Sequence, residues 1–250
     1  MYVNRTYRDN LSSKDMRSFR LSVKETDLFI SVDQESYSSD LAKIIEKNIL
    51  SLRYDLETYI AEDPEFKTIL CPYVLAPGAP PIAKIMARAA TVAGVGPMAA
   101  VAGAFAESIG RNLLRYCVEV IVENGGDIFL ASARKRLVTI FAGDSPLSNR
   151  LAFEIPSDKT PLGICTSSGT VGPSLSFGVA DAAVVISAST ALADAAASAV
   201  GNVIQTARDV KKGIRVAQSI AGILGALVIK DNQLAVWGDY NIVPVMKTGE

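Results

Sequence analysis

The sequence predicts an α+β fold, and three observations support this prediction. Short apolar runs flanked by turn residues indicate antiparallel hairpins, and alanine-rich segments with helical spacing indicate packed helices. These strands and helices occur in blocks rather than in strict alternation, which is typical of α+β proteins. No Pro-, Gly- or Ser-rich linker divides the 250 residues, so we expect a single domain over residues 1–250.

The N-terminal part predicts a hairpin followed by a long helix. Phe19–Val23 and Leu28–Val32 are apolar runs on either side of the polar turn Lys24–Asp27. Tyr37–Tyr59 carries apolar side chains at helical spacing. This apolar stripe consists of Leu41, Ile44, Ile45, Ile49, Leu52 and Leu56.

The next segment predicts a proline-rich loop and a pair of helices. Pro72–Pro81 is the loop, and Ile82–Tyr116 has a helical pattern that is broken near Gly94–Pro97. Ala89–Ala106 is uncharged, but it consists mainly of alanine and glycine, which drive membrane insertion weakly. We therefore expect a buried helix pair and no membrane partner.

The rest of the chain predicts short strands, two more helices and a last hairpin. The strands are Val118–Val122, Ile128–Ala131, Leu137–Phe141, Ala152–Ile155, Gly163–Thr166 and Ala182–Ile186. Ile128–Ala131 and Leu137–Phe141 flank the basic turn Arg134-Lys135-Arg136. The helices are Thr190–Thr206 and Arg208–Ser219, and the hairpin joins Ala226–Ile229 to Leu234–Trp237 around Asp231-Asn232.

Composition excludes several kinds of chemistry. The chain has no histidine, which excludes Ser-His-Asp and Cys-His nucleophile systems and His-ligated zinc. Its net charge of -1 provides no field for attracting nucleic acid. The three cysteines Cys71, Cys117 and Cys165 are widely spaced, which argues against a disulfide framework. Met1–Asn10 is polar and has no apolar signal-peptide core, so we expect a cytoplasmic protein.

Two polar segments that follow strands are candidates for ligand binding. In Asn124-Gly125-Gly126-Asp127, adjacent glycines let a ligand approach the main chain, and Asp127 could bind a metal or a ribose. The alternative is a tight hairpin turn, for which Asn-Gly is a common signal. In Cys165–Thr170, hydroxyl groups and a glycine could form a nest of backbone N–H groups that binds an anion, or simply a polar loop.

Two helical segments are further candidates. Asp194 and Ser198 lie four residues apart among alanines, so they share one helix face and could hold Mg²⁺ or Ca²⁺ through oxygen ligands. The alternative is that Asp194 complements the helix dipole. Ala93–Ala100 could open a helix against an anionic ligand, or provide small residues for close helix packing.

Taken together, these segments resemble the ApbE family of flavin transferases. The resemblance rests on the segments Glu123-Asn124-Gly125-Gly126-Asp127-Ile128, Cys165-Thr166-Ser167-Ser168-Gly169 and Val184–Ala195, and it covers residues 90–202. The Gly-, Ala- and Pro-rich run Ala93–Ala106 is more similar to a soluble ApbE-like family of bacteria and archaea.

The resemblance implies an ApbE-like α+β domain with antiparallel hairpins and packed alanine-rich helices. It also implies a Mg²⁺ site at Asp194 and Ser198, with FAD, FMN or another nucleotide as the ligand. The implied cofactor-binding residues are Asn124, Gly125, Gly126, Asp127, Thr166, Ser167, Ser168 and Gly169.

The sequence departs from the flavin transferases at one motif. Those proteins carry a His-x-x-Asp-Pro segment between the Thr-Ser-Gly loop and the last strand, whereas this chain has Gly172–Gly178 there and no histidine anywhere. The long glycine- and tryptophan-containing stretch for the flavin has no evident counterpart, and Trp237 is the only tryptophan. FMN transfer itself is therefore not predicted.

Three functional hypotheses follow. The first is a Mg²⁺-dependent protein that binds a flavin or another nucleotide and acts as a divergent transferase. The second is a sulfur carrier with a persulfide on Cys165 or Cys117, because archaeal members of the resembling family are associated with sulfur assimilation. The third is a non-catalytic binding scaffold. The expected partner is a small molecule or nucleotide, and the alanine-rich helices could also pack against a second copy of the chain in a homo-oligomer.

Overall fold

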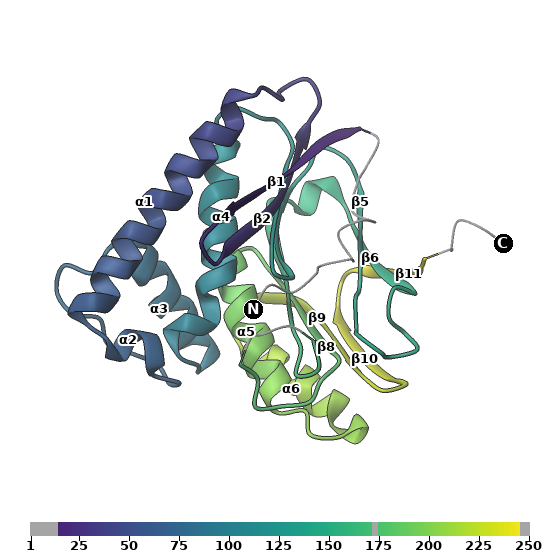
Figure 1. Cartoon of the computed structure of the whole chain (residues 1–250). Helices are drawn as coiled ribbons and strands as arrows, with labels where there is room; N and C mark the ends of the chain where they lie inside the picture. The colour runs from purple at the N-terminus through teal and green to yellow at the C-terminus, as the bar shows by residue number, and fades with distance from the viewer. Residues whose placement is uncertain (1–14, 172–174, 246–250) are drawn as a thin grey trace.

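The structure is a computed structural model that describes residues 15–171 and 175–245. It confirms the α+β class. An antiparallel sheet of eight strands, in the order β1-β2-β3-β4-β7-β8-β9-β10, forms the middle layer. Helices cover one face of this sheet, and a three-stranded sheet in the order β11-β6-β5 covers part of the other face (Figure 1).

Most of the predicted elements form, with bounds that are shifted by a few residues. The strands are β1 (Met16–Val23), β2 (Thr26–Asp33), β3 (Val120–Asn124), β4 (Asp127–Ala131), β5 (Arg136–Thr139), β6 (Leu151–Ile155), β7 (Leu162–Ser167), β8 (Ala182–Ser187), β9 (Ile223–Lys230), β10 (Gln233–Gly238) and β11 (Asn241–Pro244). The helices are α1 (Asp40–Glu62), α2 (Glu65–Thr68), α3 (Pro81–Ala93), α4 (Val101–Leu113), α5 (Thr190–Asn202) and α6 (Val210–Ser219). The 3-10 turns are η2 (Pro97–Ala100), η3 (Ser157–Lys159) and η4 (Ala207–Asp209).

Alternation along the central strands fills both faces of the eight-stranded sheet. In β7, Cys165 packs into the core beneath the helices, whereas its neighbour Ile164 packs into the core beneath the three-stranded sheet. In β8, Val185 and Val184 divide in the same way. Because side chains alternate with a period of two, both faces of these strands are apolar and buried. The cavity described below opens at one end of these strands.

The basic segment around Arg134 connects the two sheets. β4 pairs with β3 and β7, whereas β5 pairs with β6 in the second sheet. Arg136 itself begins β5, opposite Ile155. The turn that was expected at this point therefore carries the chain from one layer to the next.

The predicted break between two helices is confirmed at Gly94. This residue caps α3 in the left-handed conformation, with φ of 74°, and Pro97 starts η2. No single helix in the described parts of the chain is long and apolar enough to cross a membrane. Only when Pro81–Ala93 and Pro97–Leu113 are taken together is a described segment long and apolar enough, and this pair bends by 103°.

Helices α4 and α5 cap each other with carboxylates. Asp194 of α5 accepts a hydrogen bond from the Gly103 amide at 2.8 Å, close to the start of α4. Glu107 of α4 accepts hydrogen bonds from the Thr190 amide at 2.8 Å and the Ser189 hydroxyl at 3.1 Å, at the start of α5. Each carboxylate satisfies amides that a helix leaves without an internal partner. The two contacts show that the helices run in opposite directions, which fixes Asp194 beside the first turn of α4.

Helix α5 ends at Asn202, four residues before the predicted end at Thr206. The segment around Val179 packs against the end of this helix, where the Val179 amide donates a hydrogen bond to the Ile204 carbonyl at 2.8 Å. The bond occupies a carbonyl group that a longer helix would use for its own hydrogen bonds. A Cβ atom at Gly178 would lie 2.0 Å from the Gly201 carbonyl oxygen, so this segment approaches the helix end very closely. The contact is tertiary and has no signal in the local pattern. The sequence patterns also did not predict α2 and β11.

Candidate functional site

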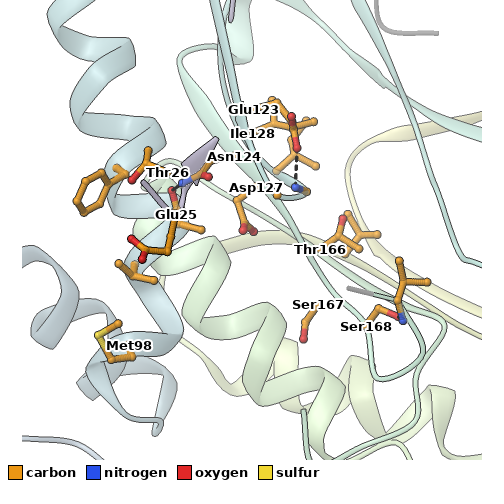
Figure 2. Close-up of a pocket in the computed structure, with 18 of the residues that line it drawn as sticks. Glu25, Thr26, Met98, Glu123, Asn124, Asp127, Ile128, Thr166, Ser167 and Ser168 are labelled. Carbon is orange, nitrogen blue, oxygen red and sulfur yellow. Dashed lines mark hydrogen bonds between the residues drawn. The ribbon is translucent and has the colours of Figure 1, made fainter. Parts of the chain in front are cut away.

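A cavity of about 920 Å³ surrounds the tip of the β3–β4 hairpin. Its polar lining comes from the hairpin tip, the end of β7, and the β1–β2 turn with the facing side of α1. In Figure 2, Asp127 lies between Met98 and Glu25 on one side and Thr166, Ser167 and Ser168 on the other. Two segments that the sequence analysis singled out therefore meet at one cavity.

The hairpin tip is both a tight turn and part of the cavity wall. Asn124 pairs with Asp127, which leaves Gly125 and Gly126 as the two turn residues, with φ of 71° and 106°. These values favour glycine. The Gly126 amide donates to Glu123 Oε1 at 2.8 Å, and Asn124 Nδ2 donates to the Ala102 carbonyl at 3.1 Å (Figure 2 marks the first bond). The predicted hairpin turn is therefore confirmed, and its residues also line the cavity.

The hydroxyl-rich end of β7 lines the cavity, with one exception. Thr166, Ser167 and Ser168 all contribute to the wall. Ser168 Oγ accepts hydrogen bonds from the amides of Thr170 at 3.1 Å and Val171 at 3.0 Å, which closes the loop into a compact turn. Gly169 is not among the described lining residues. Its amide donates to the Ala180 carbonyl at 2.9 Å, and a Cβ atom there would lie 2.0 Å from the Gly178 oxygen. Its role is therefore close backbone packing behind the loop.

Two aspartates come together beside the hairpin tip. Asp127 is buried and lines the cavity, and Asp194 on α5 is close enough for the two carboxylate charges to interact. Burial and the charge of Asp127 raise the pKa of Asp194 well above its usual range, although the amides of Gly103 and Ala102 oppose this shift. Ser198 lies one turn after Asp194 and is half-buried. Neither Asp194 nor Ser198 is among the described lining residues of the cavity.

Asp194 complements a helix dipole, but the helix is α4 and not its own. The sequence alternative placed this charge at the start of α5, where Glu107 in fact accepts the hydrogen bonds. The first amides of α4, which an anionic ligand could have used, are occupied by Asp194. The Ala93–Ala100 segment contributes Met98 to the cavity wall and otherwise packs closely against its neighbours.

The two cysteines considered as sulfur carriers are poorly placed for that chemistry. Cys165 is fully buried, and its Sγ donates to the Thr190 carbonyl at 3.3 Å. Burial, together with the charges of Asp127 and Asp194, raises the pKa of its thiol. Burial also raises the pKa of Cys117 to about 11. Because the thiolate is the reactive form, these environments oppose a persulfide carrier. Cys71, which was not a candidate sulfur carrier, is exposed.

Sequence reasoning missed the charged end of the cavity. Its wall includes Arg53 and Glu57 of α1 and Glu25 of the β1–β2 turn. Arg53 hydrogen-bonds to both glutamates, and it also donates to Thr26 at 2.9 Å. These residues are separated by a turn, a strand and part of a helix, so no short motif could have grouped them.

Comparison with known proteins identifies the relatives of this chain. A family model described as "AbpE bacteria" matches residues 8–223. A UPF0280 protein of Methanococcus aeolicus is 41% identical over 236 residues, which covers 92% of this chain and 93% of that protein. A UPF0280 protein of Methanothrix thermoacetophila is 44% identical over 204 residues, which covers 81% of this chain and 85% of that protein.

Solved structures show the same fold at low sequence identity. The flavin transferase ApbE from Vibrio cholerae matches with a TM-score of 0.58 and 12% identity, over 89% of this chain and 97% of that one. The flavinyl transferase ApbE from Pseudomonas stutzeri, in its apo form, matches with a TM-score of 0.57 and 12% identity, over 89% and 94% of the two chains. The expectation of an ApbE-like fold is thereby confirmed. With its UPF0280 relatives, the chain belongs to the ApbE-like family that the matching model describes.

Proposed function

We propose that this protein binds a flavin-type nucleotide together with Mg²⁺ in the cavity around the β3–β4 hairpin. The observation that carries the proposal is the meeting of three features at one place. These are the glycine turn Gly125-Gly126, the hydroxyl groups at the end of β7, and the aspartate pair Asp127 and Asp194. Backbone groups and hydroxyls suit phosphate oxygens, and paired carboxylates suit a divalent cation.

The cavity has apolar walls on both sides of the hairpin tip. On the helical side the walls are Leu56, Ile60, Met98, Val101 and Phe105. On the side of the three-stranded sheet they are Ile128, Val138, Ile140, Phe141, Phe153, Ile164, Val171 and Val184. A ligand that fits both regions has an apolar ring system at each end and a polar middle. A dinucleotide such as FAD has this arrangement, and a cavity of about 920 Å³ falls in the usual range for ligand sites.

The aspartate pair fits Mg²⁺ chemically. Burial and the neighbouring charge of Asp127 both raise the pKa of Asp194, and a divalent cation would stabilise the two carboxylates in their charged form. Asp194 and Asp127 would supply carboxylate oxygens, with the Ser198 hydroxyl one turn away on the same helix. When bound, the ion would neutralise phosphate charge, with water and phosphate oxygens completing its ligand set.

The names of the structural neighbours support a flavin ligand, and the composition limits the chemistry. Those neighbours are named as flavin transferases, but their low identity to this chain carries the fold alone. The chain has no histidine, so it has no counterpart of the His-x-x-Asp-Pro segment. We therefore propose ligand binding and leave FMN transfer out of the function.

Calorimetric titration tests this proposal. FAD, FMN and ADP are titrated into the full chain with Mg²⁺ and, in parallel, with EDTA. We expect binding that requires Mg²⁺ and that is lost in Asp194→Asn, a variant that removes charge at nearly constant shape. Ser108→Ala on α4 serves as the control and should bind as the parent does. Absence of binding by all three ligands, or Mg²⁺-dependent binding that persists in Asp194→Asn, would contradict the proposal.

A further inference from the structure

The part of the cavity wall formed by α1 and the β1–β2 turn contains an arginine whose donors are only partly used. Arg53 is largely buried, with 15% of its side chain exposed. Its Nη1 donates to Thr26 Oγ1 at 2.9 Å, and its Nη2 donates to Glu57 Oε1 at 2.6 Å and to Glu25 Oε2. Within residues 15–171 and 175–245, the buried Nε–H has no hydrogen-bond acceptor. A buried donor without an acceptor is rare and unfavourable.

Another arginine in the same part of the fold shows what a complete pairing looks like. Arg20 binds Asp27 through two parallel hydrogen bonds, from Nε to Oδ1 at 2.7 Å and from Nη2 to Oδ2 at 2.9 Å. Arginine binds carboxylates and phosphates most favourably in this two-bond geometry. Arg53 instead uses its Nη2 for two different carboxylates and leaves Nε unused.

The glutamate that occupies Arg53 from the β1–β2 turn is easy to displace. Glu25 is 83% exposed, so water can solvate its carboxylate as soon as the contact with the largely buried Arg53 breaks. Glu57 is held more firmly, because Lys24 also binds it at 2.7 Å. Lys24 lines the same cavity. Displacement of Glu25 would leave two cationic side chains, Arg53 and Lys24, facing the single carboxylate of Glu57.

We propose that Arg53 is a ligand-binding residue that takes an anionic group, a carboxylate or a phosphate, in place of Glu25. The incoming group would accept hydrogen bonds from both Nε and Nη2, as Asp27 does from Arg20. Glu57 keeps the guanidinium in position, and Glu25 acts as the internal anion that fills the site until ligand arrives. The inference rests on the proposed function, because it places an anion contact in the cavity proposed to hold the nucleotide, separate from the aspartate pair and from the phosphates at the Gly125-Gly126 turn.

A nuclear magnetic resonance titration tests this inference with simple anions. Inorganic phosphate and, in a separate arm, succinate are added to the full chain in EDTA at constant ionic strength, and the arginine Nε–H signals are followed. The signal that disappears in Arg53→Lys identifies Arg53. We expect this signal to shift on anion addition, since its N–H gains an acceptor. A response to phosphate alone assigns a phosphate group, and a response to succinate alone assigns a carboxylate.

Matched variants give the expected changes in affinity. Arg53→Gln should weaken anion binding about tenfold or more. The affinity of Arg53→Lys should lie between those of the parent and Arg53→Gln, because lysine keeps the charge and loses the two-bond geometry. Glu25→Gln should tighten binding about threefold, since it removes the competing carboxylate. A purely structural ion pair predicts no tightening.

Several outcomes would overturn the inference. These are an unshifted Arg53 signal in the presence of saturating anion, unchanged anion binding in Arg53→Gln, and weaker binding in Glu25→Gln. Ser108→Ala on α4, which is not among the described lining residues of this cavity, should not affect these titrations. Failure here with intact Mg²⁺-dependent FAD binding rejects the Arg53 site alone, whereas loss of FAD binding with an intact Arg53 response rejects the proposed function.

Discussion

Asp194 has two roles that impose opposite demands on its charge. As the acceptor for the Gly103 amide it stabilises the start of α4, which favours the carboxylate form. Its half-buried carboxylate lies beside Asp127, and desolvation together with this like charge raises its pKa. A carboxylate held in this way is typical of a functional site, because a structural cap alone would not need a second acid next to it.

Removal of this charge should separate stability from binding. In the absence of metal, the folded state holds the Asp194 proton more tightly than the unfolded chain does. Stability therefore falls as the pH rises above the ordinary value of 3.8. Asp194→Asn should remove this loss and raise the free energy of unfolding at pH 7 by about 1 kcal/mol. Urea denaturation without Mg²⁺ measures the change in stability, and the same experiment with Mg²⁺ shows whether the variant still binds the ion. A destabilised variant that still responds to Mg²⁺ would contradict this account.

The three cysteines should differ sharply in reactivity. Cys71 is exposed, whereas Cys117 and Cys165 are buried and have raised pKa values. With a thiol reagent at pH 8, we expect one equivalent to react quickly at Cys71 and two more to react only after unfolding. Mass spectrometry of peptides from the labelled protein identifies the sites, and Cys71→Ser is the control. Fast labelling of Cys165 in the native protein would revive the sulfur-carrier hypothesis.

At the level of elements, the site depends on how closely α4 and α5 approach. A Cβ atom at Gly103 would lie 2.4 Å from the Thr190 carbonyl oxygen and 2.8 Å from Asp194 Cβ. Small residues therefore set the distance between the helices, and the carboxylates of Glu107 and Asp194 fix their register. The alanine-rich composition of α5 is explained by this packing, since Ala191, Ala195 and their neighbours are buried.

A methyl group at Gly103 should disrupt this contact. Gly103→Ala introduces an overlap with backbone atoms that have little freedom to move, so we expect destabilisation by about 2–3 kcal/mol. It should also weaken nucleotide binding, because Asp194 would be displaced. Chemical denaturation measures the first effect, with Ser108→Ala on the same helix expected to stay within about 0.5 kcal/mol of the parent. Equal stability of Gly103→Ala and the parent would show that the helices can separate freely.

The capping role of Glu107 is tested by a pair of variants. Glu107→Ala leaves the amides at the start of α5 without their acceptor and should cost about 1–2 kcal/mol, as is typical for the loss of a helix cap. Glu107→Gln keeps an acceptor oxygen and loses only the charge, so it should cost less. The comparison is made by urea denaturation at pH 7. A larger effect for the glutamine variant would contradict the capping explanation.

The local patterns predicted the elements well because hydrophobic periodicity reflects the faces that each element buries. The first and last hairpins and the break at Gly94 all lie where these patterns placed them. The early end of α5 could not be predicted, because it depends on a hydrogen bond from the Val179 amide to the Ile204 carbonyl, and these two residues are far apart in the sequence. The same reason applies to Arg53, whose partners Glu25 and Thr26 lie on a strand hairpin far from it in sequence.

At the scale of the whole molecule, the layered fold explains why the cavity forms where it does. The β3–β4 hairpin lies in the central sheet, with helices on one side and the three-stranded sheet on the other (Figure 1). Its tip is thus the one point at which the described cavity can draw apolar walls from both layers and polar groups from the turn itself. The motif Asn124-Gly125-Gly126-Asp127 is visible in the sequence, but only the layered fold shows that it lies in the wall of a larger cavity.

The most direct test of the central claim is a crystal structure of the protein grown with FAD and Mn²⁺, which takes the same oxygen ligands as Mg²⁺. Anomalous scattering locates the metal independently of the nucleotide. We predict an anomalous peak beside Asp127 and Asp194, with the FAD phosphates at the Gly125-Gly126 turn and its rings on either side of the hairpin. A cavity without metal or nucleotide under saturating conditions, or FAD bound elsewhere on the surface, would contradict the claim.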